Sequence, residues 1–198
     1  MSKFVAMAAG AAVVLGLGTA GAFVAFAPEK QCSRSAIATG ADSIGGPFVL
    51  VNGDGVTVTN EDVITGPTMV YFGFTYCPDF CPTDLARNAA AIDLLAERGI
   101  EVASLFITVD PTRDTPEVVK EYAEVMHPDM IGLTGTPEQV DAASKAYKTY
   151  YRKNGTGEDY LMDHSTFTYL MDPDGFVDFF RSDTAPEAVV ERTACHVG

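Results

Sequence analysis

The hydrophobic pattern of the chain changes sharply near residue 28. Residues 4–27 contain no charged residue, no amide side chain and no proline, and an apolar segment of this length can cross a bilayer as a helix. Residues 28–46 are polar and rich in small residues, whereas from Pro47 onward short apolar runs alternate with polar turns. The pattern predicts four parts: a tail at 1–3, a transmembrane anchor at 4–27, a linker at 28–46 and a folded domain at 47–198.

The charges around the apolar segment predict its orientation. Lys3 is the only charged residue before the segment, and basic residues stay on the cytoplasmic side of a membrane. A eukaryotic import sequence would place an Arg- and Ser-rich amphipathic stretch before the apolar segment, and residues 1–3 are not such a stretch. We therefore expect a single-pass protein of a bacterial inner membrane, with its C-terminal domain in the periplasm. The alternative is a cleaved signal, since residues 25–27 (AFA) resemble a cleavage site, but Pro28 after the cut disfavours processing.

The first half of the domain reads as strands and a helix. Strand-like residues 48–51 and 56–59 flank the turn residues 52–55 and predict a β-hairpin. A continuous apolar run at 68–74 predicts a strand that is buried on both faces, and residues 101–109 predict a second buried strand. Between these runs we expect a helix that ends at Gly99. Its apolar face is predicted to consist of Leu85, Ala89, Ile92 and Leu95 or Ala96.

The second half of the domain continues with helices and a hairpin. Helices are predicted to open at Thr115–Pro116 and at Thr136–Pro137, the latter with a capping box. Strand-like residues 165–171 and 176–180 flank a turn, and Thr184 is expected to cap a final helix. Parallel βαβ units followed by an antiparallel hairpin and a closing helix form a thioredoxin-like layout. We predict an α/β, thioredoxin-like fold with an N-terminal β-hairpin extension, preceded by one transmembrane helix.

The composition excludes some classes of partner. The chain has 27 Asp and Glu against 13 Lys and Arg, which gives a formal net charge of −14. Nucleic acids and anionic lipid surfaces attract basic patches, so neither is an expected partner. Residues 16–21 spell the dinucleotide-binding pattern GxGxxG, but that pattern carries meaning only between a strand and a helix. Inside an apolar segment it indicates small residues that ease helix packing.

Two of the four cysteines lie at a position suited to chemistry. Cys77 and Cys81 fall where the buried strand at 68–74 gives way to a helix, at the sheet edge where ligands collect. With Pro82 expected at the first helical position, Cys81 is predicted near the N-cap, where the helix dipole favours thiolates. Such a pair can bind a soft metal ion such as Cu(I), or it can close a disulfide.

A third ligand would come from one of three histidines. His127 precedes Pro128 at a predicted helix end, where a capping role is expected, and His196 lies next to the C-terminus, where we expect disorder. His164 precedes a late strand, and in a thioredoxin-like layout that segment returns beside the first helix start. His164 is therefore the candidate ligand, although a lone histidine is more often structural.

Three blocks of sequence resemble the signature of the Sco/SenC family of copper proteins. They are residues 73–82 (GFTYCPDFCP), 109–116 (VDPTRDTP), and 163–165 (DHS) followed by 169–175 (YLMDPDG). The resemblance covers Pro47 to about Thr193. Tyr76 departs from it, because the family often has His before the first cysteine.

The resemblance implies that Cys77, Cys81 and His164 are ligands of copper, as Cu(I), Cu(II) or both. The implied function is that of a metallochaperone, not an enzyme, which assists assembly of the copper centre of cytochrome c oxidase. The implied partners are the copper-bearing oxidase subunit, other periplasmic copper chaperones and a thioredoxin-like reductant. Asp79, between the cysteines, offers a hard oxygen donor to Cu(II), but a solvated acid at the helix start is the simpler interpretation.

A membrane-anchored periplasmic thiol–disulfide oxidoreductase remains the alternative. It would use Cys77 and Cys81 as its redox-active pair and keep the cysteines of an oxidase subunit or copper protein reduced. Against it, the C-x₃-C spacing differs from the C-x₂-C of typical redox motifs, and His164 stands where thioredoxins have a proline. An oxidising periplasm also permits a structural disulfide between Cys32 and Cys195, but the sequence does not decide that pairing.

Overall fold

The computed structural model describes residue 32 and residues 43–198. The chain divides into two units, Met1–Cys32 and Ser33–Gly198. The predicted tail, the predicted anchor and most of the predicted linker lie outside the described residues. Within the described part of the chain, no helix is long and apolar enough to cross a membrane.

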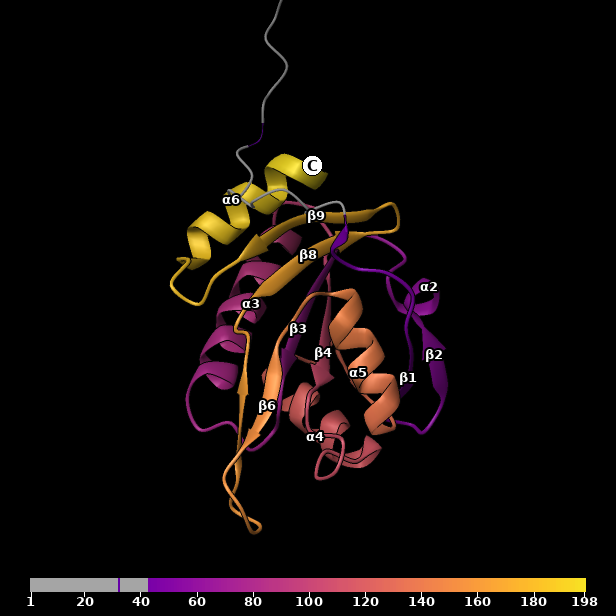
Figure 1. Cartoon of the computed structure of the whole chain (residues 1–198). Helices are drawn as coiled ribbons and strands as arrows, with labels where there is room; N and C mark the ends of the chain where they lie inside the picture. The colour runs from indigo at the N-terminus through magenta and orange to yellow at the C-terminus, as the bar shows by residue number, and fades with distance from the viewer. Residues whose placement is uncertain (1–31, 33–42) are drawn as a thin grey trace, which may run out of the picture. The chain divides into compact units, whose positions relative to one another are not determined.

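The second unit is built on a seven-stranded sheet with the strand order β2-β1-β5-β4-β3-β8-β9 (Figure 1). Strands β3, β4 and β5 are parallel to one another, whereas β8 is antiparallel to β3 and to β9. The strands of this sheet are β1 (Val49–Asn52), β2 (Thr57–Thr59), β3 (Thr68–Gly73), β4 (Ala103–Thr108), β5 (Met130–Thr134), β8 (Thr168–Asp172) and β9 (Gly175–Phe180).

Helices cover both faces of the sheet. Met69 of β3 packs with residues of α3 (Phe80–Ala96) and α6 (Pro186–Val197), and α4 (Pro116–Met126) packs on the same face, where Tyr122 contacts Phe106. Successive strand residues point to opposite faces, so Phe72 lies on the other side. There Tyr147, at the end of α5 (Pro137–Ala146), meets Phe72 with ring centroids 5.2 Å apart. The sheet is therefore buried on both faces, as its apolar strands require.

Most of the predicted elements are present. The N-terminal hairpin forms with β1 antiparallel to β2, and all six residues of β3 are buried. Gly99, just beyond α3, has a φ of +76°, the left-handed conformation that suits a helix C-terminus. The parallel β3–α3–β4 unit, the antiparallel β8–β9 hairpin and the closing α6 confirm the predicted α/β layout.

Three predictions near the end of the chain were wrong in detail. The strand predicted at 165–171 is β8, which begins later, at Thr168; β7 (Leu161–His164), which pairs with β6 (Tyr151–Asn154) in a separate two-stranded sheet, was not predicted. Helix α6 begins after an N-cap at Ala185, without a side-chain cap. The Thr184 hydroxyl oxygen instead accepts from the backbone N–H of Arg181. In the same helix, His196 is ordered, contrary to expectation.

Besides β6 and β7, two short elements have no counterpart in the sequence prediction. Helix α2 (Asn60–Val63) follows β2 directly, with a capping box formed by Thr59 and Asp62. Strand β5 lies between α4 and α5 and pairs with both β4 and β1. It joins the N-terminal hairpin to the central strands, so the predicted extension is continuous with the main sheet.

Candidate metal centre

The two cysteines lie at the carboxyl end of β3. Helix α3 begins at Phe80 after an N-cap at Asp79, so Cys81 is its second residue and Cys77 lies in the preceding loop. Pro82 is therefore the third helical residue and not the first, which corrects the predicted helix start. Proline is tolerated in this turn because the first N–H groups of a helix have no intrahelical partner. Cys81 is fully buried, whereas Cys77 is partly exposed.

Gly73, the last residue of β3, makes room for the buried sulfur. A Cβ atom at this position would lie 2.8 Å from Cys81 Sγ and about as close to the rings of Tyr71 and Phe106. Real Cβ atoms do not approach sulfur so closely. The Cys81 side chain thus packs directly against strand backbone, and any side chain at position 73 would displace it.

The structure brings His164 to the cysteines across 83 positions of sequence. Its Nε2 lies 3.4 Å from Cys81 Sγ, and the backbone N–H of Cys81 donates to Cys77 Sγ over 3.4 Å. The ligand atoms of Cys77, Cys81 and His164 all lie within 4.8 Å of one another. All three predicted ligands therefore meet in one place.

The orientation of the His164 ring leaves one nitrogen available. His164 Nδ1 lies 2.9 Å from the carbonyl oxygen of Ser165, which only accepts, so Nδ1 carries the hydrogen. The rings of Tyr71 and Phe74 stand edge-on to the imidazole at centroid distances of 6.3 and 5.7 Å. These contacts hold Nε2 toward the sulfurs, where its lone pair is available to a metal once no proton occupies it. A backbone partner of this kind is the usual way in which metal-ligating histidines are oriented.

The two thiols differ in acidity. A hydrogen bond from the Cys81 side chain, together with contact to His164 and the N–H groups of Asp79 and Cys81, lowers the pKa of Cys77 to about 4, against the effect of partial burial. Hydrogen bonding to Cys77, burial and the charge of Cys77 raise the pKa of Cys81. The expectation of two acidic thiols was therefore wrong for Cys81, because its burial opposes the helix dipole.

A buried carboxylate supports the loop that carries Cys77. Asp114 is fully buried and accepts hydrogen bonds from the Thr75 N–H (3.0 Å), the Thr75 hydroxyl (2.6 Å) and the Thr108 hydroxyl (2.6 Å). Burial raises the pKa of Asp114. Asp114 belongs to the second sequence block, residues 109–116, and it ties the loop to the end of β4. No periodicity signals this role, since the contact joins residues far apart in sequence.

A second buried polar group lies behind Cys81. The Tyr71 hydroxyl donates to Asp84 over 3.1 Å, and Arg87 forms an ion pair with Asp84 at 3.3 Å in which both side chains are almost fully buried. Arg87 also donates to Thr168 of β8 over 2.9 Å. The group links β3, α3 and β8 beneath the cysteines, and the sequence analysis did not identify it.

The remaining candidates lie elsewhere. His127 is the C-cap residue of α4, as predicted, and its Nε2 lies 3.3 Å from Asp93. His196 Nε2 lies 3.7 Å from Asp178. Asp79 is exposed and makes no side-chain cap at α3. Cys77 and Cys81 are free thiols, whereas Cys32 and Cys195 are disulfide-bonded; the pairing of these two with each other stays a prediction.

Comparison with known proteins places this site in a family. Residues 36–198 match the family model described as SCO1/SenC. Protein SenC of Rhodobacter capsulatus is 53% identical over 200 residues, which cover 98% of this chain and 90% of that protein. The mitochondrial protein SCO1 homolog 1 of Arabidopsis thaliana is 47% identical over 144 residues, which cover 71% of this chain and 43% of that protein.

Solved structures agree with the sequence relatives. Arabidopsis thaliana ScoI with copper bound has a TM-score of 0.72 and 44% identity, and the match covers 75% of this chain and 94% of that chain. Bradyrhizobium japonicum ScoI with copper bound has a TM-score of 0.70 and 37% identity, with 77% and 99% covered. Because the family model matches most of its length and several relatives match at high identity, the chain belongs to the SCO1/SenC family.

Proposed function

We propose that the protein binds copper through Cys77 Sγ, Cys81 Sγ and His164 Nε2 and assists the assembly of the copper centre of cytochrome c oxidase. The observation that carries the proposal is the convergence of these three ligand atoms within 4.8 Å. Thiolates select soft ions such as Cu(I), and imidazole suits copper in both oxidation states. The copper is cargo here, received from one protein and passed to another.

The donor set fits the ion. Cys77 is ionised at neutral pH because its pKa is about 4, so one thiolate exists before metal binds. Cys81, whose pKa is raised, has to lose its proton when it ligates, which makes binding release a proton and depend on pH. His164 already holds its hydrogen on Nδ1, so Nε2 needs no rearrangement of protons.

The exposure of the site fits transfer between proteins. Cys81 is buried, but Cys77 and His164 are partly exposed, so an incoming ligand from another protein reaches the metal without opening the fold. Tyr76 and Phe80, on either side of the exposed cysteine, are 59% and 53% exposed. An apolar rim around a metal site suits a transient contact with a partner.

The relatives support this assignment. Structures of the Arabidopsis and Bradyrhizobium ScoI proteins, at 44% and 37% identity, were solved with copper bound. We extend the proposal to the setting that the sequence predicts: a bacterial inner-membrane anchor, a periplasmic domain, and the copper-bearing oxidase subunit, other copper chaperones and a thioredoxin-like reductant as partners.

A thiol–disulfide oxidoreductase is the second candidate, and one observation favours it. An exposed thiol of low pKa next to a buried thiol of raised pKa is an arrangement suited to attack by Cys77 and resolution by Cys81. The two functions differ in their need for His164. Disulfide exchange requires two thiols, whereas the copper site requires all three side chains.

The test replaces His164 by Ala in the reduced full-length chain. Competition with a Cu(I) chelator should show a loss of affinity of at least ~10–100-fold, the scale seen when residues that merely orient metal ligands are removed, while disulfide exchange with a small-molecule disulfide changes only by a small factor. His127→Ala is the matched control, because His127 lies at the end of α4 and contacts Asp93 of α3. This variant should leave copper affinity and the rate of disulfide exchange unchanged. Unaltered copper affinity in His164→Ala, with full oxidase activity in cells at low copper, would identify the protein as a reductase.

A further inference from the structure

The third ligand is carried by a part of the fold outside the main sheet. His164 is the last residue of β7, which pairs only with β6 among the described strands, with Tyr151 opposite His164. Two partly buried side chains of this hairpin, Tyr151 and Met162, pack against the core. The cysteines, in contrast, follow β3 at the centre of the main sheet. The distance from His164 to the cysteines thus depends on what holds the hairpin in place.

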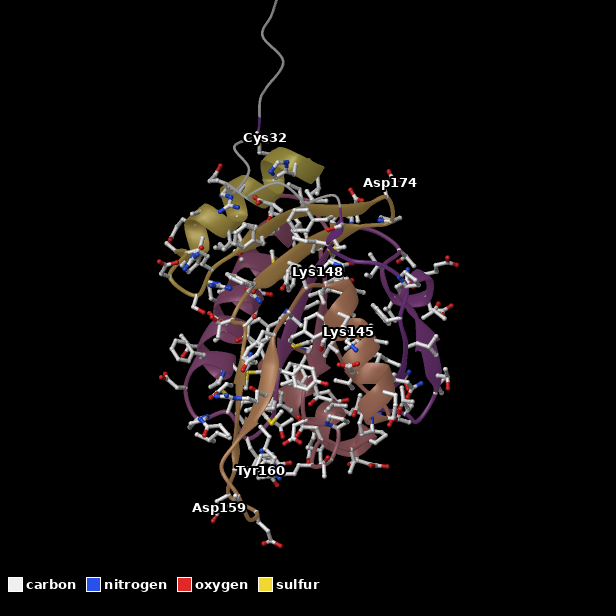
Figure 2. The ribbon with its side chains drawn as sticks, in the orientation of Figure 1. Cys32, Lys145, Lys148, Asp159, Tyr160 and Asp174 are labelled. Atoms are coloured by element: carbon white, nitrogen blue, oxygen red, sulfur yellow. The ribbon has the colours of Figure 1, made fainter. Side chains whose placement is uncertain are left out.

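Tyr160 fastens the outer end of this hairpin. It directly precedes β7, is 7% exposed, and lies near the hairpin tip (Figure 2). Its hydroxyl donates to Asp110 over 2.7 Å. Two cations stack on its ring, with Arg113 Cζ and Lys153 Nζ each 3.6 Å from the centroid. A tyrosine at a hairpin end would ordinarily face solvent, so this burial indicates a specific contact.

Arg113 connects Tyr160 with the segment that carries the first cysteine. Its guanidinium carbon lies 4.5 Å from the ring centroid of Tyr76, the residue before Cys77. Its Nη1 donates to the carbonyl oxygen of Glu158 in the hairpin tip over 3.2 Å. One planar guanidinium therefore touches both ligand-bearing segments, the loop on one side and the hairpin on the other.

Asp110 ties these contacts to the main sheet. It is 3% exposed, follows β4, and its backbone N–H donates to the Thr108 hydroxyl over 2.9 Å. One carboxylate oxygen accepts from Tyr160 and the other accepts from Arg113 Nε over 2.6 Å. Because both oxygens are used, Asp110 fixes the hydroxyl and the guanidinium relative to each other and to β4.

We propose that Tyr160 and Arg113 are positioning residues for the metal centre, which clamp the β6–β7 hairpin onto the Cys77 loop and so hold His164 Nε2 at the sulfurs. The inference rests on the proposed copper-binding function. Neither residue touches the metal; each lowers the entropic cost of bringing the imidazole to the thiolates, as preorganisation does in any binding site. Without the clamp, the cysteines stay in place and the hairpin moves.

A double-mutant cycle with the full-length reduced chain tests this. Tyr160→Leu, which removes both the ring and the hydroxyl, should weaken Cu(I) binding ~10-fold, at the lower end of the range for groups that orient metal ligands. In a His164→Ala background the same change should have no further effect, since a residue that acts through His164 cannot act without it. Tyr160→Phe, which keeps the stacked ring, should restore most of the affinity.

Hydrogen exchange in the metal-free protein supplies a second readout. Tyr160→Leu should speed amide exchange at residues 161–164 and leave exchange in α3 unchanged, because the clamp acts on the hairpin alone. Tyr150→Leu is the matched control: this tyrosine precedes β6, is 55% exposed, and should change neither exchange nor copper affinity.

Each outcome decides between the proposals. The positioning role would be overturned if Tyr160→Leu lowered copper affinity equally in the parent chain and in the His164→Ala variant, or if it lowered affinity in neither. If His164→Ala itself leaves copper affinity intact, the proposed ligand set fails, and the exchange measurement still judges whether Tyr160 holds the hairpin. Unchanged exchange at residues 161–164 in Tyr160→Leu overturns the clamp in either case.

Discussion

At the scale of single residues, the centre shows how burial separates two identical side chains. Both cysteines stand near the start of α3, where the helix dipole favours the thiolate. Cys77 reaches solvent and collects the available donors, while Cys81 packs against the backbone of β3 and loses hydration. Position relative to the sheet, more than position along the helix, determines which thiol ionises.

This difference predicts selective alkylation in the reduced, metal-free protein. Because the pKa of Cys77 is about 4, its thiolate fraction stays near one from pH 9 down to about pH 5 and falls only as the pH drops through 4. The rate of its modification by iodoacetamide, followed by peptide mass spectrometry, should therefore be nearly flat over that range. Cys81 should remain unmodified, since its pKa is raised and its sulfur is buried.

The unfolded protein is the control for this measurement. In denaturant both thiols should react with the ordinary pH dependence of cysteine, rising toward a pKa of ~8.5. A folded-state rate at Cys77 that climbs about tenfold per pH unit between pH 6 and 8, as the ordinary thiol pKa requires, would contradict the low pKa.

The sequence identifies the ligands more readily than their surroundings. Cys77 and Cys81 are visible as a pair at a strand–helix junction, and His164 becomes a candidate once the topology is known. Asp114 and Tyr160 could not be found in this way, because their roles depend on contacts with Thr75 and Asp110, distant in sequence. Contacts between residues distant in sequence produce no periodic pattern of hydrophobic and polar positions.

At the scale of elements, strength of pattern decided which predictions held. Strand β3 is buried throughout and apolar after Thr68, so its prediction was secure. Strand β5 has five residues, one of them glycine, and an exposed Ile131, so it resembles a loop between two helices. Strand β7 alternates weakly and ends in two polar residues. Its status as a strand depends on pairing with β6, which no local pattern specifies.

The capping box at α5 leads to a stability prediction. The Thr136 hydroxyl accepts from the Gln139 N–H, and the Gln139 side chain accepts from the Thr136 N–H in return. Thr136→Ala removes the first of these bonds from an end that already lacks intrahelical partners. We expect the free energy of unfolding, measured by denaturant titration, to fall by about 1 kcal/mol.

Thr156→Ala is the matched control, because Thr156 is exposed in the turn between β6 and β7. The free energy of unfolding of the Thr156→Ala variant should stay within about 0.5 kcal/mol of that of the parent protein, as for ordinary surface changes. A similar loss in both variants would show that the Thr136 cap contributes nothing specific.

The capping role predicted for Thr184 was wrong for a simple physical reason. Pro186 fixes the start of α6, and the Thr184 hydroxyl accepts a hydrogen bond within the turn before it.

At the scale of the whole molecule, the candidate functional residues lie at the carboxyl ends of the parallel strands. The carboxyl ends of β3 and β4 deliver Cys77 and Asp110, which is where α/β sheets gather their ligands. The order of the longer strands and helices was predictable because each of these elements has its own apolar pattern. The separate β6–β7 sheet was not, since its placement is decided by contacts to the rest of the domain.

We propose that residues 4–27 anchor the chain in a membrane, which would set how the chain is placed in the cell. Residues 4–27 follow Lys3, the only charged residue before them, so the N-terminus is expected in the cytoplasm. A reporter enzyme that is active only in the periplasm, fused after Gly198, should be active, and the full-length protein should sediment with membranes. Quantitative release into the soluble periplasmic fraction would show that the signal-like site at 25–27 is cleaved.

The pairing of β6 with β7 also determines which side chain, and so which kind of donor atom, faces the two cysteines. His164 stands opposite Tyr151, and Asp163, held by Arg152 and Asn154, faces the other way. A slip of one residue in this ladder would exchange the faces of the strand. The cysteines would then meet the carboxylate of Asp163 or the hydroxyl of Ser165, and oxygen donors suit harder ions than copper(I). Strand register thereby decides whether a nitrogen or an oxygen donor faces the two sulfurs.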